Sequence, residues 1–312
     1  MKKNLFSWMT IMMMVFVCVG FSACGSDDND DPVKPNPQET SGGDEQKPSQ
    51  DDSSANEDML KTPLTLEAIE TGTITLKNQA AGPVTYRVNG GEAQAIESKT
   101  TEEITVVKGD KVTFFGDNAS YGYVGHSRSH IACSAACYIY GNIMSLVTST
   151  NFATANKLEH GNTFSYLFSD NYHKGYIKNH PSYQLMLPAT TLADSCYLSM
   201  FYGCTGLTKA PKLPSTTLAE CCYSRMFEHC EALTEAPELP ATTLAEFCYF
   251  EMFSYCTKLS SVTCLATVFS DNSCTYRWLY GVSSAGTFTK AKDVEWQTGA
   301  NGIPEGWTVV ER

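Results

Sequence analysis

The sequence has few basic residues and gathers none of them into a stripe or patch. It carries 22 Lys and Arg against 34 Asp and Glu in 312 residues, a formal charge of −12 at pH 7. Residues 25–60 hold two lysines and eleven acids, so −9 of this charge lies in that stretch. Proteins that bind nucleic acids neutralise phosphates with clustered basic side chains. We therefore expect no nucleic-acid partner.

Recognisable catalytic sets are absent as well. The sequence holds no acid pair, nucleophile triad or glycine-rich phosphate loop in a supporting context. None of its 13 cysteines has the neighbouring His and acid that would activate a nucleophile. We predict that the protein is not an enzyme and has no catalytic residue, cofactor or resident metal.

A long apolar run lies at the N-terminus. Lys2 and Lys3 precede apolar residues 5–21, and small residues follow. This pattern is typical of a secretion signal over residues 1–23; an uncleaved membrane helix is the alternative, because the run is at the short edge of a span. The sequence Phe-Ser-Ala before Cys24 resembles a bacterial lipobox with an aromatic residue in place of the usual Leu. That resemblance implies a lipid on Cys24, which would anchor the chain to a membrane.

Residues 24–61 contain almost no large apolar side chain, so they cannot bury a core and are predicted to be a disordered acidic tether. The tether begins with the run Ser-Asp-Asp-Asn-Asp-Asp at residues 26–31. This run resembles the export signal of Bacteroides-type surface lipoproteins. It implies a lipid-anchored, surface-exposed location on the outer membrane, and a merely solvated tail is the alternative.

Residues 62–118 alternate apolar and polar side chains between Gly, Pro and Asn turn signals. A period of two is typical of half-buried strands. We predict a small antiparallel β-sandwich over these residues, whose shape would suit a carbohydrate-binding module or an inert spacer.

Residues 126–137 combine metal-ligand residue types at short spacing: His126, His130, Cys133 and Cys137. Zinc is one interpretation. A disulfide between Cys133 and Cys137 is a second, because thiols facing an oxidising exterior tend to pair. Unpaired thiols near a domain junction are the third and preferred interpretation.

The largest regularity is a 26-residue repeat across residues 187–290, with Cys196-Tyr197 and Met200-Phe201 recurring in each early copy. Residues 119–186 are expected to hold a junction and an atypical first repeat. Such a period indicates stacked units that bury their apolar faces on their neighbours. Three predicted capping boxes would each start a helix: Thr191–Asp194, Thr217–Glu220 and Thr243–Glu246. A short strand ended by prolines would follow each helix.

These patterns together predict an α+β multi-domain fold. The β-sandwich would be followed by a short right-handed solenoid of strand–helix repeats, in which Lys209 lies beside Glu235 and Lys212 beside Glu238. Residues 291–312 would close it as a β-hairpin cap, with Trp296 and Trp307 packed in the core. Repeated cysteines such as Cys196 and Cys222 are predicted to be buried free thiols, although stacked neighbours would also lie within disulfide range.

The repeat Leu-Pro-Ala-Thr-Thr-Leu-Ala-(Asp/Glu)-x-Cys-Tyr-x-x-Met-Phe-x-x-Cys-x-x-Leu resembles that of the BspA-like leucine-rich-repeat surface lipoproteins, as do residues 140–146 and 302–309. The resemblance implies a non-enzymatic surface protein that binds or adheres to an extracellular protein or matrix ligand. A carbohydrate-binding accessory lipoprotein that uses the N-terminal β-domain is the alternative. Because packing accounts for the repeated residues, the candidate ligand contacts are positions that vary between copies: Lys209, Glu235, Lys212, Glu238, Tyr202, Glu228, His229 and Tyr255.

Overall fold

The alternating segments of the N-terminal half form strands in the computed structural model, which describes residues 57–122, 127–172, 174–271 and 273–312. The predicted signal, Cys24 and nearly all of the tether lie outside the described residues. The elements, in chain order, are β1 (Thr65–Ala68), β2 (Gly72–Asn78), β3 (Val84–Val88), β4 (Gln94–Ile96), β5 (Thr100–Val106), β6 (Lys111–Gly116), β7 (His130–Cys133), β8 (Cys137–Asn142), the 3₁₀ helices η1 (Ile143–Leu146) and η2 (Ser169–Asn171), β9 (Ile177–Asn179), β10 (Leu185–Met186), β11 (Ser261–Cys264), β12 (Thr287–Lys290) and β13 (Thr308–Glu311).

Two sheets build the N-terminal half. The larger runs in the order β10-β8-β1-β6-β3-β4, with β9 also paired to β8, and the smaller runs β5-β2-β7. Alternation decides which side chains face inward: Ile74 and Leu76 of β2 are buried and the residues between them are less so. Buried side chains of both sheets belong to one apolar core.

This half differs from the predicted antiparallel sandwich in two ways. Both sheets take strands from beyond residue 118, since β7 joins the smaller sheet and β8 the larger. The larger sheet is also mixed, because β9 and β10 pair with β8 in parallel. The last residues of the predicted tether are ordered too, as residues 57–61 form a helical turn.

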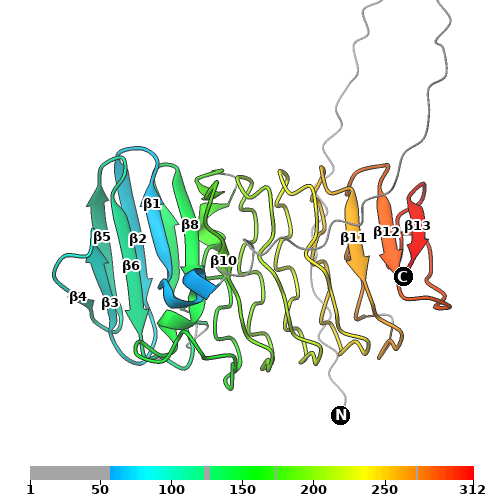
Figure 1. The fold of residues 1–312 in the computed structure, drawn as a ribbon, viewed down its shortest axis with the longest axis horizontal. Coiled ribbons are helices and arrows are strands. Elements are labelled where there is room, and N and C mark those ends of the chain that lie inside the picture. Colours follow the sequence, from blue (N-terminus) through cyan, green and yellow to red (C-terminus); the bar gives the residue numbers. More distant parts are fainter. Residues whose placement is uncertain (1–56, 123–126, 173, 272) are drawn as a thin grey trace, which may run out of the picture. The chain divides into compact units, whose positions relative to one another are not determined.

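The predicted strand–helix solenoid is wrong, because the described residues of the repeats contain no helix. Successive repeats lie side by side between β10 and β11 as coils built from turns (Figure 1). Their backbone N–H groups alternate between two acceptors. The N–H of Tyr197 donates to the carbonyl of Cys222 in the next coil at 3.0 Å, whereas that of Leu198 donates to Ser195, three residues back, at 3.1 Å. An α-helix would send every N–H four residues back.

A left-handed residue at every fourth position explains this pattern. In the first coil φ is 57° at Ser195, 51° at Ser199 and 69° at Gly203. A helix of L-residues excludes such values, since each costs about 1–2 kcal/mol. The same conformation recurs in the next two coils at Cys221, Arg225, His229, Phe247, Glu251 and Tyr255.

The predicted capping boxes cap nothing. Thr191 forms a parallel bridge with Lys157, and Thr243 forms one with Val268, so these residues join neighbouring coils. Apolar pairs that recur every four residues resemble one face of a helix, although a helix would rotate that face by about 80° over eight residues. Four-residue turns keep the pairs Cys196-Tyr197 and Met200-Phe201 buried without any rotation.

The predicted register between coils is confirmed at one position. Lys209 forms a parallel bridge with Glu235, which forms another with Ser261. The expected charge pairs are not found: among the described side chains Lys209 and Lys212 form no ion pair with Glu235 or Glu238. Glu238 instead lies 3.2 Å from the guanidinium of Arg312.

The C-terminal cap is not the predicted hairpin. Strands β11, β12 and β13 pair in parallel, with Phe288 opposite Val262 and Val309. The three strands continue the stack of coils to the last described residues. The prediction that Trp307 packs in the core is confirmed, since it is 7% exposed. Trp296 packs against the same core and stacks on Trp278 with ring centroids 5.5 Å apart.

Candidate functional site

The turn segments of the coils form one face of the stack, and its side chains differ from coil to coil; some of them are exposed, and others, such as Ser199, Glu228 and Ser254, are buried. We call it the turn face. It is made of the residues that lie between successive buried pairs in four stacked coils: Leu198, Ser199, Tyr202 and Gly203; Ser224, Arg225, Glu228 and His229; Phe250, Glu251, Ser254 and Tyr255; and Tyr276, Arg277, Tyr280 and Gly281. Four of the eight predicted contacts belong to it.

A row of aromatic rings runs along one edge of the turn face, and we call it the aromatic ridge. Tyr172 stacks on Tyr202 with centroids 4.9 Å apart, and His229 stacks on Tyr255 at 4.6 Å. Tyr202 meets His229 edge-on at 5.8 Å. Tyr280 meets Tyr255 in the same way at 5.4 Å. The ridge therefore crosses successive coils of the stack.

Tyr172 enters the ridge because Gly203 has no side chain. A Cβ on Gly203 would lie 1.7 Å from the Tyr172 ring, so the glycine leaves the space that the ring occupies. Burial, together with a hydrogen bond to Tyr172, raises the pKa of Tyr202 to about 12. The two rings are thus fixed at their faces and at their hydroxyl groups.

A chain of alternating charges lies beside the ridge. Arg225 bonds Glu251 at 2.6 Å, and Glu251 lies 3.8 Å from Arg277. Glu228 is 3.7 Å from the Nε of Arg225 and 4.0 Å from His229. Arg225 lies closer to Glu251 than to Glu228, and the Oε2 of Glu228 is buried without a hydrogen-bond partner. Burial raises the pKa of Glu228 to about 7, against the opposing pull of Arg225.

Both arginines are also held against aromatic rings. The guanidinium of Arg225 lies 5.3 Å from the centre of the Phe250 ring, and that of Arg277 lies 4.2 Å from the centre of the Tyr280 ring. Phe250 in turn stacks on Tyr276 at 5.3 Å. Contacts of this kind contribute about 0.5–1 kcal/mol each at exposed sites. They leave a surface whose long side chains are already ordered.

The other four predicted contacts lie elsewhere, where a cavity of about 560 Å³ opens between two coils. Lys209 and Lys212 come from one coil, and Glu235 and Glu238 from the next. The remaining wall consists of apolar residues: Ala210, Leu213, Pro214, Ala236, Pro237 and Pro240. We call this cavity the proline groove. The structure therefore divides the predicted site into two separate places.

Sequence reasoning missed much of the turn face. Arg225, Glu251 and Arg277 stand 26 residues apart, so the repeat itself aligns them in one column. Tyr280 occupies the column of Tyr202 and could have been found in the same way. Tyr172 could not, because it joins the ridge from outside the periodic part of the chain.

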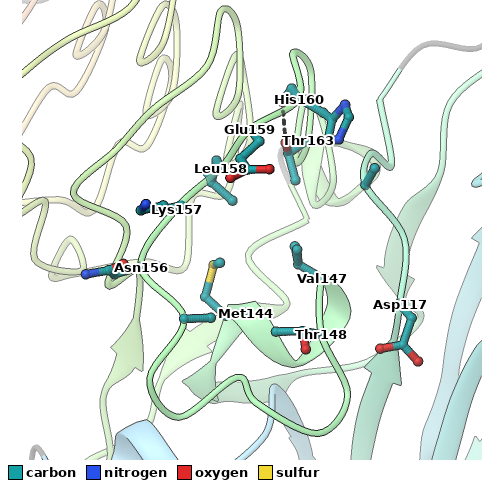
Figure 2. A pocket seen from close by; sticks show the side chains of 12 residues that line it. Asp117, Met144, Val147, Thr148, Asn156, Lys157, Leu158, Glu159, His160 and Thr163 are labelled. Carbon is teal, nitrogen blue, oxygen red and sulfur yellow. Dashed lines mark hydrogen bonds between the residues drawn. The ribbon is translucent and has the colours of Figure 1, made fainter.

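A second cavity, of about 420 Å³, lies where the sheets meet the first coil. Figure 2 shows the side chains of Lys157, His160 and Asp117 spread around its rim rather than converging on one point. Asp117 is already engaged, since its carboxylate accepts hydrogen bonds from the backbone N–H and the hydroxyl of Ser149. This cavity offers no set of polar groups arranged for chemistry.

The segment with metal-ligand residue types does not form a metal site in the part of the chain that the structure describes. No group of three or more His, Cys, Asp or Glu side chains that could hold a metal ion occurs among these residues. His126 lies outside them. Cys133 and Cys137 are buried thiols.

No helix among the described residues is both long enough and apolar enough to cross a membrane. Comparison with protein-family models, with curated proteins and with solved structures gave no match. The resemblance to BspA-like lipoproteins stays a prediction, and the geometry of the turn face carries the functional argument.

Proposed function

We propose that the chain is a non-enzymatic binding protein, held on the outer membrane by a lipid on Cys24, that contacts an extracellular protein through its turn face. The observation that carries the proposal is the contrast within each coil. In the first three coils the buried pairs repeat the same Cys, Tyr, Met and Phe, whereas the turn-face positions change from coil to coil. Packing explains the repeated buried residues, whereas the variable turn-face residues are available to recognise a ligand.

The residue types of the turn face favour a protein ligand. Tyr and Arg are enriched at the centres of protein interfaces, where they supply most of the binding energy. Here Tyr255 and Tyr280 are 36% and 41% exposed. Hydrogen bonds between coils and ring stacking already fix these side chains, so binding would cost little further ordering.

Ring orientation favours protein over glycan. The planes of Tyr172 and Tyr202 are 5° apart, and those of His229 and Tyr255 are 7° apart. These stacked rings cover one another's faces, and Arg277 covers one face of the Tyr280 ring. A sugar packs its C–H groups on an open ring face, whereas polar ring edges suit the hydrogen-bonding groups of a polypeptide.

The N-terminal sheets offer less to a glycan. The aromatic residues of 62–118 are Tyr86, Phe114 and Phe115; the first two are buried, and Phe115 packs edge-on against Phe152. No exposed ring is available among the described residues of this segment. We therefore do not advance the alternative of carbohydrate binding by the β-domain.

The test is a binding screen of the full chain against extracellular-matrix proteins and glycans, repeated with two variants. Tyr255→Ala with Tyr280→Ala should weaken protein binding by at least tenfold, because removing a central aromatic contact costs more than about 1 kcal/mol. Tyr183→Ala is the matched control, since Tyr183 is 40% exposed and lies outside the turn face. Binding to glycans alone, or equal binding by the double variant, would contradict the proposal.

Display at the surface is tested separately. Protease added to intact cells should digest the protein, and Cys24→Ala should release it from the membrane fraction. Protection of the protein in intact cells, with digestion only after lysis, would argue against an outward location.

A further inference from the structure

Cys133 and Cys137 stand at the point where the chain passes from one sheet to the other. Cys133 ends β7 and pairs with Ile74 of the smaller sheet, while Cys137 begins β8 and pairs with Ala68 of the larger sheet. Both side chains are buried, with 3% and 2% exposure. A bond between them would therefore join the two sheets at one corner.

The turn between them is short and tightly held. Ser134 exchanges two hydrogen bonds with the backbone of Thr73, one through its hydroxyl and one through its N–H. Ala135 packs so closely on Gly72 that a Cβ on that glycine would lie 2.8 Å from the Cβ of Ala135. These contacts fix the turn that separates the two cysteines.

The two thiols are hydrogen-bonding partners of each other. The sulfurs of Cys133 and Cys137 interact directly, and the Cys137 thiol also donates to the carbonyl oxygen of Ala135 at 3.6 Å. Thiols in the coils also donate to backbone carbonyls, at 2.9–3.9 Å: Cys196, Cys204, Cys230, Cys256 and Cys274. What distinguishes Cys133 and Cys137 is that they interact side chain to side chain across one short turn.

We propose that Cys133 and Cys137 form a disulfide when the folding chain meets a disulfide oxidant. The Cys137 thiolate attacks one sulfur of the oxidant, forms a mixed disulfide and releases the first oxidant thiolate. Cys133, after losing its proton, attacks Cys137 and releases the second thiolate. Two protein thiols thereby lose two protons and two electrons, and the oxidant is reduced to two thiols.

Electrostatics agree with this order of attack. The hydrogen bond from Cys133 lowers the pKa of Cys137, so its thiolate forms more readily. The same hydrogen bond and burial raise the pKa of Cys133. Because both side chains are buried in the complete fold, we expect the exchange during folding, after the two sulfurs have come together and before the sheets close over them.

The test is differential alkylation of the full chain. Protein purified from its host is denatured without reductant, alkylated, then reduced and treated with an isotopically heavy form of the same reagent. Trypsin cleaves after Arg128 and Lys157, so one peptide contains both cysteines and no other. We expect this peptide to carry two heavy labels, and to weigh about 2 Da less than the dithiol form when reduction is omitted. The coil cysteines should carry light labels.

Light label on both Cys133 and Cys137, or a link from either of them to another cysteine, would overturn the pairing. Cys137→Ser should expose Cys133 to the light reagent, and this readout does not depend on folding because the protein is denatured. The inference rests on the proposed export for its oxidant but not on any ligand. Refolding the reduced chain with glutathione disulfide distinguishes the pairing from the export. If Cys133 and Cys137 form a disulfide in this refolding but are free thiols in protein taken from cells, the pairing is supported and the export is not.

Discussion

The two halves of this chain use the same apolar residue types to build different structures. In the N-terminal sheets each strand buries every second side chain, as Ile74 and Leu76 show. In the coils the large apolar side chains are buried as an adjacent pair in every four residues, as in Met226-Phe227. Backbone hydrogen bonds differ in the same way. Strands exchange them with neighbouring strands, whereas coil N–H groups alternate between the next coil and a local turn. The comparison shows that a sequence period constrains which residues are buried more tightly than it constrains the backbone.

The largest expected effect comes from the stacked core. Phe227 is fully buried and lies between Phe201 and Phe253, each with its ring centroid 5.6 Å away. Phe227→Ala should lower the free energy of unfolding by about 3–5 kcal/mol, since it removes a large side chain and leaves a cavity. Phe114→Ala, at an equally buried position in β6, is the matched change in the sheets. Urea unfolding followed by fluorescence measures both, and a loss below about 1 kcal/mol for Phe227→Ala would mean that the coils are loosely packed.

The next effect is a pH dependence that the sheets should not share. The pKa of Glu228 is about 7 in the folded chain, against an ordinary value of 4.5. The folded state therefore binds a proton that the unfolded state lacks between these two pH values, and its stability falls as pH rises through that window. Glu228→Gln should raise the free energy of unfolding at pH 8 by about 1 kcal/mol, once screening by solvent and Arg225 is allowed for.

The measurement is chemical denaturation of both proteins at pH 5 and pH 8. Glu220→Gln is the control, because Glu220 is an exposed acid in the same coil. An unchanged slope of stability against pH in Glu228→Gln would show that another group is responsible for it.

How much the sequence could predict also differs between the halves. Alternation specified the strands around Ile74, because a period of two has a single common structural solution. Pairs such as Cys196-Tyr197 admit both a helix and a series of turns, and local capping signals at Thr191 favoured the wrong one. What decides between them is the bond from Tyr197 to the next coil, a long-range contact that no local pattern contains.

The candidate site shows the same limit. Variation between copies led to Tyr202, Glu228, His229 and Tyr255, and all four lie on the turn face. The charged positions Lys209 and Glu235 were grouped with them by the same reasoning, although they line the proline groove. Periodicity shows which residues occupy equivalent positions in successive coils. The direction in which those residues face depends on the turns.

A smaller effect tests the left-handed backbone directly. Ser195 has a φ of 57°, so Ser195→Gly should leave stability unchanged or raise it by up to about 1 kcal/mol. In a helix the same change would cost about 0.5 kcal/mol. Thr75→Gly in β2 is the contrasting change, because glycine weakens a strand interior by about 0.5–1 kcal/mol. Thermal and urea unfolding of the two variants should give effects of opposite sign. If both substitutions destabilise the chain, the backbone at Ser195 is helical or extended rather than left-handed.

The smallest effect concerns the ion pair that replaced a predicted one. Arg312 and Glu238 lie 3.2 Å apart, with side chains 60% and 48% exposed. Solvent screens such a pair, so Arg312→Ala should change the free energy of unfolding by less than about 0.5 kcal/mol, and less still in high salt. By contrast, Arg277 is held by Glu251 and the Tyr280 ring, so Arg277→Ala should cost more and keep part of its effect in salt. Equal costs for the two variants would mean that the ordered charges of the turn face are no better fixed than an ordinary surface pair.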